Sequence, residues 1–329
     1  MTINQTPLKD KKNLLAFSAG IDSTALFFIL LKQNIPFDIA IIDYNKRSQS
    51  KLEVAFAKEL SLKYNKKCFV KDVQLPDSNF EKNARDIRYI YFEELISEFS
   101  YDNLLTAHQL NDKLEWFLMQ LSKGAGLIEL IGLTQIELRD NYNLVRPILD
   151  YSKNELLHFL DENNLKYFTD ESNFEDKYQR NYFRKNFANK FLNEFEKGVK
   201  RSFDYLEKDI TSLKIELVPV FKNSDLEIFR KNQDDNKNIR TIDKSLKIRG
   251  LMLSKKQRDE VIKQKEIVLS NKIAVSLFED FIWIAPLSSS IMDKKFKEIC
   301  RVYKIPKNIR PYLYDIDVDI KELSQRLVF

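Results

Sequence analysis

A short polar turn near the start of the chain carries residues suited to binding phosphate. Ser18, Gly20, Asp22 and Ser23 follow one apolar run and lead into a second. Hydroxyl groups and the unpaired N–H groups at a helix start attract anions, and small residues let a ligand approach the backbone. Gly20 can adopt a positive φ, which gives this turn conformational freedom. The turn predicts a phosphate-binding site; the alternative is an ordinary helix start with Asp22 and Ser23 as capping residues.

A second group of polar residues consists of His108, Asp112 and Glu115. If the whole stretch is helical, their spacing of i, i+4 and i+7 places them one above another on a single face. Two interpretations remain open from the residues alone. The three side chains form part of a functional site, or they form a solvated polar face with apolar residues packed behind it.

Strands and helices alternate along the stretch that carries both groups. Strands are predicted over residues 14–17, 37–43, 67–73 and 103–107, and helices over residues 21–32, 51–64, 83–99 and 151–163. This alternation predicts a doubly wound parallel sheet of the α/β class, which binds ligands above the carboxyl ends of its strands. Ser18, Asp43 and His108 all fall at such ends. The order of elements therefore brings the two polar groups to one edge of the sheet.

The polar turn resembles the Ser-Gly-Gly-x-Asp-Ser signature of the PP-loop (N-type) ATP pyrophosphatases. The matching residues are Ser18, Ala19, Gly20, Ile21, Asp22 and Ser23. Ala19 replaces the usual glycine, which matters little if Ala19 has a negative φ. A Walker A loop is excluded, because it would end in Gly-Lys-Ser or Gly-Lys-Thr. The resemblance implies an adenine nucleotide alpha hydrolase-like fold in which these residues bind ATP.

Further blocks between about residues 13 and 187 are similar to the tRNA(Ile)-lysidine synthetase family. They are, in chain order, Arg47, Ala84-Arg85 with Arg88-Tyr89, Thr106-Ala107-His108 with Asp112 and Glu115, Lys123 to Gly126, Arg146-Pro147, and Asp170-x-Ser172-Asn173 through Arg180-Asn181 to Arg184. The chain also departs from the family, whose usual His-Gly, His-His and Asp-Asp pairs are replaced by Tyr44-Asn45, His108-Gln109 and Asn111-Asp112. In that segment, the functional roles implied by the resemblance are therefore assigned only to His108, Asp112 and Glu115.

The resemblance implies an ATP-dependent ligase that forms a carbon–nitrogen bond on RNA. ATP would adenylate the C2 oxygen of the wobble cytidine of tRNA(Ile) with a CAU anticodon and release pyrophosphate. Free L-lysine would then attack C2 and expel AMP, which changes codon reading from AUG to AUA. Catalytic residues in this scheme are Asp22, His108, Asp112 and Glu115.

The roles of these residues follow from the charges in that reaction. Pyrophosphate is a highly charged leaving group, so it needs backbone N–H donors and a cation, which implies Mg²⁺ near Asp22. The lysine ammonium must lose a proton, and Asp112 or Glu115 could hold it and help to remove that proton. Contacts to phosphate or tRNA are expected from Arg47, Arg85, Arg88, Arg180 and Arg184.

Composition sets broad limits on the partners of the 329-residue chain. A net charge of +5 permits an RNA partner without requiring one. Cys68 and Cys300 suggest neither a disulfide framework nor a zinc site, so a reducing cytoplasm is the expected location. The apolar segment 14–31 has Asp22 near its middle, which disfavours a membrane span.

The length predicts two domains. We expect a PP-loop catalytic domain over residues 1–200 and a smaller α+β accessory domain over residues 201–329. The second contains a basic stretch from Arg240 to Lys265, followed by two strand-like segments. That stretch is either a face that contacts tRNA or a solvated helix. The oligomeric state is left open, a dimer included.

Three other functions are compatible with parts of the sequence. A PP-loop tRNA thiolase would need cysteines that carry sulfur or hold a cluster, but Cys68 is isolated and no Cys-x-x-Cys occurs. A PP-loop amidotransferase would bring a glutaminase, for which no Cys/His nucleophile arrangement is visible. A noncatalytic RNA-binding protein with a decayed ATP site is disfavoured by the intact Ser18, Asp22 and Ser23.

Overall fold

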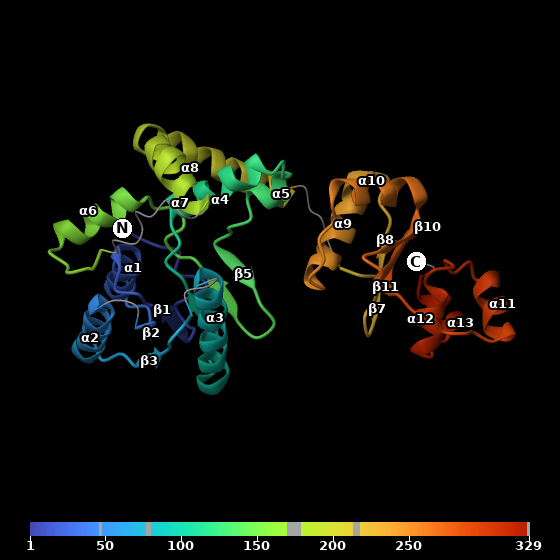
Figure 1. The fold of residues 1–329 in the computed structure, drawn as a ribbon, viewed down its shortest axis with the longest axis horizontal. Helices are drawn as coiled ribbons and strands as arrows, with labels where there is room; N and C mark the ends of the chain where they lie inside the picture. Colours follow the sequence, from blue (N-terminus) through green and yellow to red (C-terminus); the bar gives the residue numbers. More distant parts are fainter. Residues whose placement is uncertain (46–47, 77–79, 170–178, 213–217, 328–329) are drawn as a thin grey trace. The chain divides into compact units, whose positions relative to one another are not determined.

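The computed structural model describes residues 1–45, 48–76, 80–169, 179–212 and 218–327 (Figure 1). The chain divides into two compact units, Met1–Ser212 and Leu213–Phe329. The boundary expected at residue 200 falls inside helix α8 (Asn189–Ser212), which belongs to the first unit. Each unit has its own sheet and its own buried core.

The first unit is built on a six-stranded sheet in the order β3-β2-β1-β4-β6-β5. Its strands are β1 (Asn13–Ala16), β2 (Asp38–Asp43), β3 (Cys68–Asp72), β4 (Asn103–Leu105), β5 (Ile136–Leu138) and β6 (Asn143–Val145). Neighbouring strands are parallel except β5, which runs antiparallel to β6 at the edge. The predicted doubly wound α/β fold is confirmed, and the antiparallel edge strand β5 was not predicted from the sequence.

Helices cover both faces of this sheet because its strands are apolar on both sides. The helices of the unit are α1 (Ile21–Lys32), α2 (Ser48–Lys63), α3 (Phe80–Phe99), α4 (Leu110–Ser122), α5 (Leu127–Leu130), α6 (Lys153–Glu162), α7 (Gln179–Phe183), a π-helical turn (Arg184–Ala188) and α8. Leu15 of β1 packs with α1, α2 and α6, whereas Leu14 packs with α3 on the opposite face. Figure 1 shows α1 and α2 on one side of the strands and α3 on the other.

The second unit contains a five-stranded antiparallel sheet in the order β7-β8-β11-β10-β9. Its elements are β7 (Phe221–Asn223), β8 (Leu226–Arg230), α9 (Asp235–Ile248), α10 (Lys255–Gln264), β9 (Glu266–Leu269), β10 (Ile273–Phe278), β11 (Phe281–Pro286), α11 (Lys294–Val302), α12 (Arg310–Asp315) and α13 (Ile320–Leu327). Helices α9 and α10 pack on one face, and α11, α12 and α13 pack on the other. The predicted accessory α+β fold is confirmed.

Candidate functional site

The direction of the connections reverses between β1 and β4, which lie side by side at the centre of the first sheet. The chain passes from β1 through β2 to β3 on one side, and then from β4 to β6 on the other. Parallel sheets bind ligands at such a reversal, because the loops leaving the two neighbouring strands separate there. Ser18 follows β1 and Thr106 follows β4, so the polar turn and the His108 segment flank this point.

The positive φ in the polar turn lies at Ala19 and not at Gly20. Gly20 has φ −76° and serves as the N-cap of α1, so it does not use the positive φ that a glycine allows. Ala19 instead adopts φ 58° and is fully buried. In the left-handed conformation the Cβ atom is crowded against the next carbonyl group. This explains why the signature usually has a glycine, which lacks Cβ, at this position. Hydrogen bonding holds the strained residue in place, since Phe168 N donates to Ala19 O at 2.9 Å.

The start of helix α1 leaves its backbone N–H groups available to an anion. None of the described side chains caps the helix. The Ser23 hydroxyl instead accepts a hydrogen bond from Ser18 N at 3.2 Å and lies 3.0 Å from the Ser18 hydroxyl. These contacts fold the turn over the helix terminus without using its N–H groups. The geometry favours the phosphate-binding interpretation over the capped-helix alternative.

Asp22 is a half-buried residue in the first turn of α1. Its Oδ1 atom is buried and has no hydrogen-bond partner among the residues that the structure describes. Burial, and then the nearby charge of Asp112, raise the pKa of Asp22 to about 7. Lys153 and Arg184 oppose that rise. An unsatisfied buried carboxylate is costly, so its presence here indicates a cationic partner when the site is filled.

This raised pKa predicts a pH-dependent difference in stability between the wild type and Asp22→Asn. The folded protein binds a proton at Asp22 up to about pH 7, whereas the unfolded chain releases it near 3.8. Ionisation therefore favours the unfolded state, and wild-type stability falls between these two values as the pH rises. Without ATP and Mg²⁺, we expect Asp22→Asn to gain stability over the wild type across this window. Thermal unfolding at pH 5 and pH 8 tests this; an equal gap at both values would contradict it.

His108 lies before helix α4 and not within it. Gln109 is the N-cap of α4, so the prediction that His108, Asp112 and Glu115 share one helix face is wrong for His108. The ring of His108 nevertheless lies at the same site, with Nδ1 3.0 Å from the Thr106 hydroxyl. Burial lowers the pKa of His108 to about 4 despite the opposing charge of Asp112. The imidazole is therefore neutral near pH 7 and can exchange hydrogen bonds without adding a charge.

Asp112 and Glu115 face two arginines from a distant part of the chain. Arg180 donates to Asp112 Oδ1 at 2.6 Å and to Glu115 Oε2 at 3.0 Å. Arg184 donates through Nε to Glu115 Oε1 at 2.5 Å. The two carboxylates are three residues apart on α4, and the two arginines are four residues apart on α7 and the π-helical turn. Each spacing places both members of the pair on one face of their helix, so the two faces contact each other. Figure 1 shows α4, α7 and α8 close together at one end of the unit.

The burial of these carboxylates makes the arginine contacts important for the site. Glu115 is only 1% exposed, and Asp112 is also buried. The second oxygen of Asp112 accepts a hydrogen bond from Gln109 N, which completes the capping box of α4. Burial opposes the ionised form of Asp112, but Arg180, His108 and Arg184 together hold its pKa below the usual range. The four side chains therefore form a dense charged cluster beside the polar turn.

The remaining predicted arginines differ in their surroundings. Arg85 and Arg88 are exposed on α3. Arg85 stacks on Tyr89 at 5.4 Å, and Arg88 donates to the Tyr44 hydroxyl at 3.4 Å. The charge of Arg85 contributes to the lowered pKa of His108, which associates α3 with the site. Arg47 and the matched block Asp170 to Asn173 lie outside the described residues.

Three polar residues at this site were missed in the sequence analysis. Lys153 opens α6, and its charge acts on Asp22. Asn111 accepts a hydrogen bond from Lys153 N at 3.1 Å and donates to Asn189 at 2.8 Å, which joins α4 to α6 and α8. Lys113 is 2% exposed and forms an ion pair with Glu207 of α8 at 2.5 Å. No local pattern marks these residues, because each contact joins helices that are distant in sequence.

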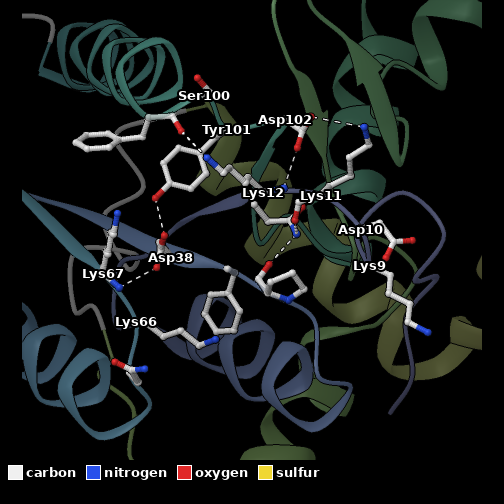
Figure 2. Close-up of a pocket in the computed structure, with 15 residues that line it drawn as sticks. Lys9, Asp10, Lys11, Lys12, Asp38, Lys66, Lys67, Ser100, Tyr101 and Asp102 are labelled. Carbon is white, nitrogen blue, oxygen red and sulfur yellow. Dashed lines mark hydrogen bonds and ion pairs between the residues drawn. The ribbon is translucent and has the colours of Figure 1, made fainter.

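A cavity of about 780 Å³ lies at the opposite edge of the sheet, near the starts of its strands (Figure 2). Its lining is rich in lysines, including Lys9, Lys11, Lys12, Lys66 and Lys67. Two of its acidic residues are already engaged. Asp38 accepts hydrogen bonds from the Tyr101 hydroxyl at 2.7 Å and from Lys67 N at 2.8 Å, and Asp102 accepts one from Lys12 N at 2.8 Å. Of the predicted site residues that the structure describes, none lines this cavity.

Comparison with known proteins identifies the family. Residues 2–191 match the PP-loop domain family. The tRNA(Ile)-lysidine synthase of Campylobacter jejuni strain RM1221 is 47% identical over 318 residues, which cover 96% of this chain and 97% of that protein. The chain belongs to the tRNA(Ile)-lysidine synthase family. The Wolinella succinogenes member is 41% identical over 313 residues and matches 95% of each chain. The family resemblance seen in the sequence is therefore confirmed, and it extends through the second unit.

A solved structure supports the fold of this family member. The U34-tRNA thiolase NcsA of Methanococcus maripaludis, with its [4Fe-4S] cluster, matches with a TM-score of 0.52 and 15% identity, covering 63% of this chain and 75% of that one. At this identity the likeness concerns the fold alone. Across the described residues, no helix combines the length and the apolar character needed to span a membrane.

Proposed function

We propose that this protein ligates free L-lysine to C2 of the wobble cytidine of tRNA(Ile) with a CAU anticodon. The C2 oxygen attacks the α-phosphate of ATP and releases pyrophosphate. The ε-amine of lysine then attacks C2, and AMP leaves. The observation that carries this proposal is the exposed helix start of the polar turn beside the charged cluster of Asp112, Glu115, Arg180 and Arg184, in a chain of this family. The proposed substrates fit the cytoplasmic location expected from the sequence.

ATP binding in this proposal uses residues 18–23. The free N–H groups of α1 and the hydroxyls of Ser18 and Ser23 face the end of β1, where phosphates would lie. Backbone donors are suited to pyrophosphate, because they stabilise developing charge without having to move. Ala19 holds the turn in the conformation that exposes these groups. Arg85 and Arg88, which are exposed on α3, remain proposed contacts to tRNA.

The site also fits Mg²⁺. Mg²⁺ in nucleotide sites is held by one or two carboxylates together with substrate phosphates. Asp22 supplies a buried carboxylate oxygen that lacks a partner among the described residues, next to the helix start. Within that part of the chain no three acidic, histidine or cysteine side chains gather into a metal cluster, so phosphate oxygens would complete the coordination. When bound, the ion neutralises charge on the departing pyrophosphate.

The second step needs a place for the lysine ammonium, and the structure narrows the choice. Each oxygen of Glu115 accepts a hydrogen bond from an arginine, which suits a residue that orients Arg180 and Arg184. Asp112 Oδ1 accepts hydrogen bonds from Arg180 at 2.6 Å and from Arg184 at 3.5 Å. The charge of Asp112 also acts to raise the pKa values of both Asp22 and His108, which places Asp112 near these two residues. We therefore assign the ammonium to Asp112 Oδ1 and a positioning role to Glu115. Neutral His108 can accept a hydrogen bond from the amine.

The thiolase alternative is weakened by the surroundings of both cysteines. Burial raises the pKa of Cys300 to about 11 despite the opposing charge of Arg310. Burial also raises the pKa of Cys68. Sulfur transfer uses a thiolate, which these environments disfavour. The two residues also lie in different units, Cys68 in β3 and Cys300 in α11.

The proposed function predicts that labelled lysine becomes attached to RNA. With ATP, Mg²⁺ and an unmodified tRNA(Ile) transcript, we expect retention of labelled lysine on the RNA, and digestion should give cytidine plus lysine minus water by mass spectrometry. A transcript with the wobble cytidine changed to uridine is the matched control and should remain unlabelled. A thiolated nucleoside, or no product from the CAU transcript, would count against the proposal.

We also propose that the second unit contributes to tRNA binding through α10. Lys255 and Lys256 are exposed in its first turn, whereas Arg258 forms an ion pair with the buried Asp243 at 3.2 Å. Neutralising Arg258 would therefore disturb folding, so the test uses the two lysines. We expect Lys255→Gln with Lys256→Gln to weaken tRNA binding and to flatten the plot of log K against log salt by ~0.7–0.9 for each lost phosphate contact.

A matched control for α10 is Lys294→Gln with Lys295→Gln, because these exposed lysines also open a helix of the second unit. ATP binding should be unchanged in both double variants. A salt slope that equals the wild-type slope, or equal flattening in the two variants, would show that α10 is not a specific contact.

A further inference from the structure

The helical segment that supplies Arg180 and Arg184 also carries an exposed row of aromatic side chains. Tyr182, Phe187, Phe191 and Phe195 are 50%, 45%, 49% and 52% exposed. We call these four residues the aromatic row. Phenylalanines at this helical spacing are normally buried, so half-exposed rings in succession indicate a surface that meets a partner.

The position of the aromatic row follows from the helix geometry. Phe187 and Phe191 immediately precede Ala188 and Leu192, which are buried in the core formed with α4. One residue corresponds to about 100° around a helix, so the row lies beside the face that packs on α4. Tyr182 is two residues from both Arg180 and Arg184, so the row begins on the helix that supplies the charged cluster but on a different side of it. It continues through the π-helical turn and α8 as far as Phe195, where the backbone departs from helical geometry (φ −123°, ψ 21°).

Neighbouring rings of the aromatic row pack against each other in two pairs. Tyr182 and Phe187 have ring centroids 5.7 Å apart, and Phe191 and Phe195 have centroids 5.0 Å apart. Basic residues outnumber acidic ones over residues 182–201, with Arg184, Lys185, Lys190, Lys197, Lys200 and Arg201 against Glu194 and Glu196. Aromatic faces with interspersed positive charge are the combination that binds single-stranded nucleic acid, because bases stack on rings while cations meet the phosphates.

We propose that the aromatic row is a stacking surface for unpaired bases of the tRNA anticodon loop. This inference rests on the proposed function, which requires the wobble cytidine to reach the site beside Arg180 and Arg184. Nucleotides adjacent to that cytidine then lie where the row begins. Stacking tolerates any base, so the row holds the loop while other contacts select the sequence.

The test compares two triple variants of the full-length protein. In one, Phe187, Phe191 and Phe195 are changed to leucine, which keeps an apolar surface but removes the rings. In the other, the same residues are changed to tyrosine, which keeps the rings. The probes are an anticodon-arm hairpin with a CAU loop, carrying 2-aminopurine beside the wobble position, and a fully paired duplex of equal length. Unfolding curves establish that both variants fold.

We expect the leucine variant to bind the hairpin about tenfold more weakly and to lose the quenching of 2-aminopurine, while the tyrosine variant retains both. Duplex binding and the KM for ATP should not change. Wild-type hairpin binding by the leucine variant would overturn the inference. So would a leucine variant that loses affinity only through a change in oligomeric state seen by sedimentation, because the row would then join two copies of the chain. Failure of lysine ligation by the wild type would instead overturn the proposed function.

Discussion

Replacing Asp22 by asparagine is expected to lower pyrophosphate release by at least ~10²-fold in the presence of lysine and tRNA. Loss of one group that stabilises developing charge typically costs ~10²–10³ in rate. Asp22 qualifies because its buried Oδ1 has no partner among the described residues and lies at the helix start that would face the phosphates. Asparagine preserves the size of the side chain but cannot supply the negative charge that Mg²⁺ requires.

The control for this substitution is Asp86→Asn, which makes the same chemical change on the exposed surface of α3. It should retain wild-type turnover. Raising the Mg²⁺ concentration should recover part of the activity of Asp22→Asn if the ion is held mainly by phosphates. Near-wild-type turnover of Asp22→Asn at low Mg²⁺ would exclude Asp22 as the proposed metal ligand.

The strands of the sheet could be predicted because each is marked by a pattern within a short segment of the sequence. Apolar runs such as residues 38–43 read as buried parallel strands, and the helices between them have clear ends, as in the capping box of Ser152 and Glu155. Strand order then placed Ser18 and His108 at one edge. The edge strand β5 was missed because it spans only three residues, Ile136–Leu138, which are too few to show a periodic pattern.

Contacts between distant segments could not be predicted in the same way. Arg180 and Glu115 are 65 residues apart, and Arg184 and Glu115 are 69 apart. Their charges suggested phosphate and lysine as partners, whereas in the structure they bind each other. The positive φ at Ala19 was likewise hidden, because alanine itself gives no signal for that conformation. The positions of the candidate residues in the fold were therefore predicted better than the interactions among them.

The contacts among these charged residues lead to the second large expected effect. Replacing both Arg180 and Arg184 by methionine should lower the free energy of unfolding by ~3–5 kcal/mol. Burial already raises the pKa of Glu115, and its buried carboxyl group would lose both guanidinium groups that oppose this rise. Glu115 is 1% exposed and contacts both arginines. Denaturant titration at pH 7 measures the loss. Arg301→Met is the control, since its ion pair with Glu298 is exposed to solvent and its loss should leave the free energy of unfolding nearly unchanged.

A third substitution separates stability from catalysis at this cluster. Adding Glu115→Gln to the double methionine variant removes the buried charge, so we expect recovery of more than half of the lost stability. Lysine ligation should stay at least ~10²-fold below the wild type, because the arginines proposed to meet phosphate are still missing. If activity returns together with stability, the arginines serve only to neutralise Glu115. If stability fails to return, the cost lies in the packing of α7 against α4 and not in the unpaired carboxylate.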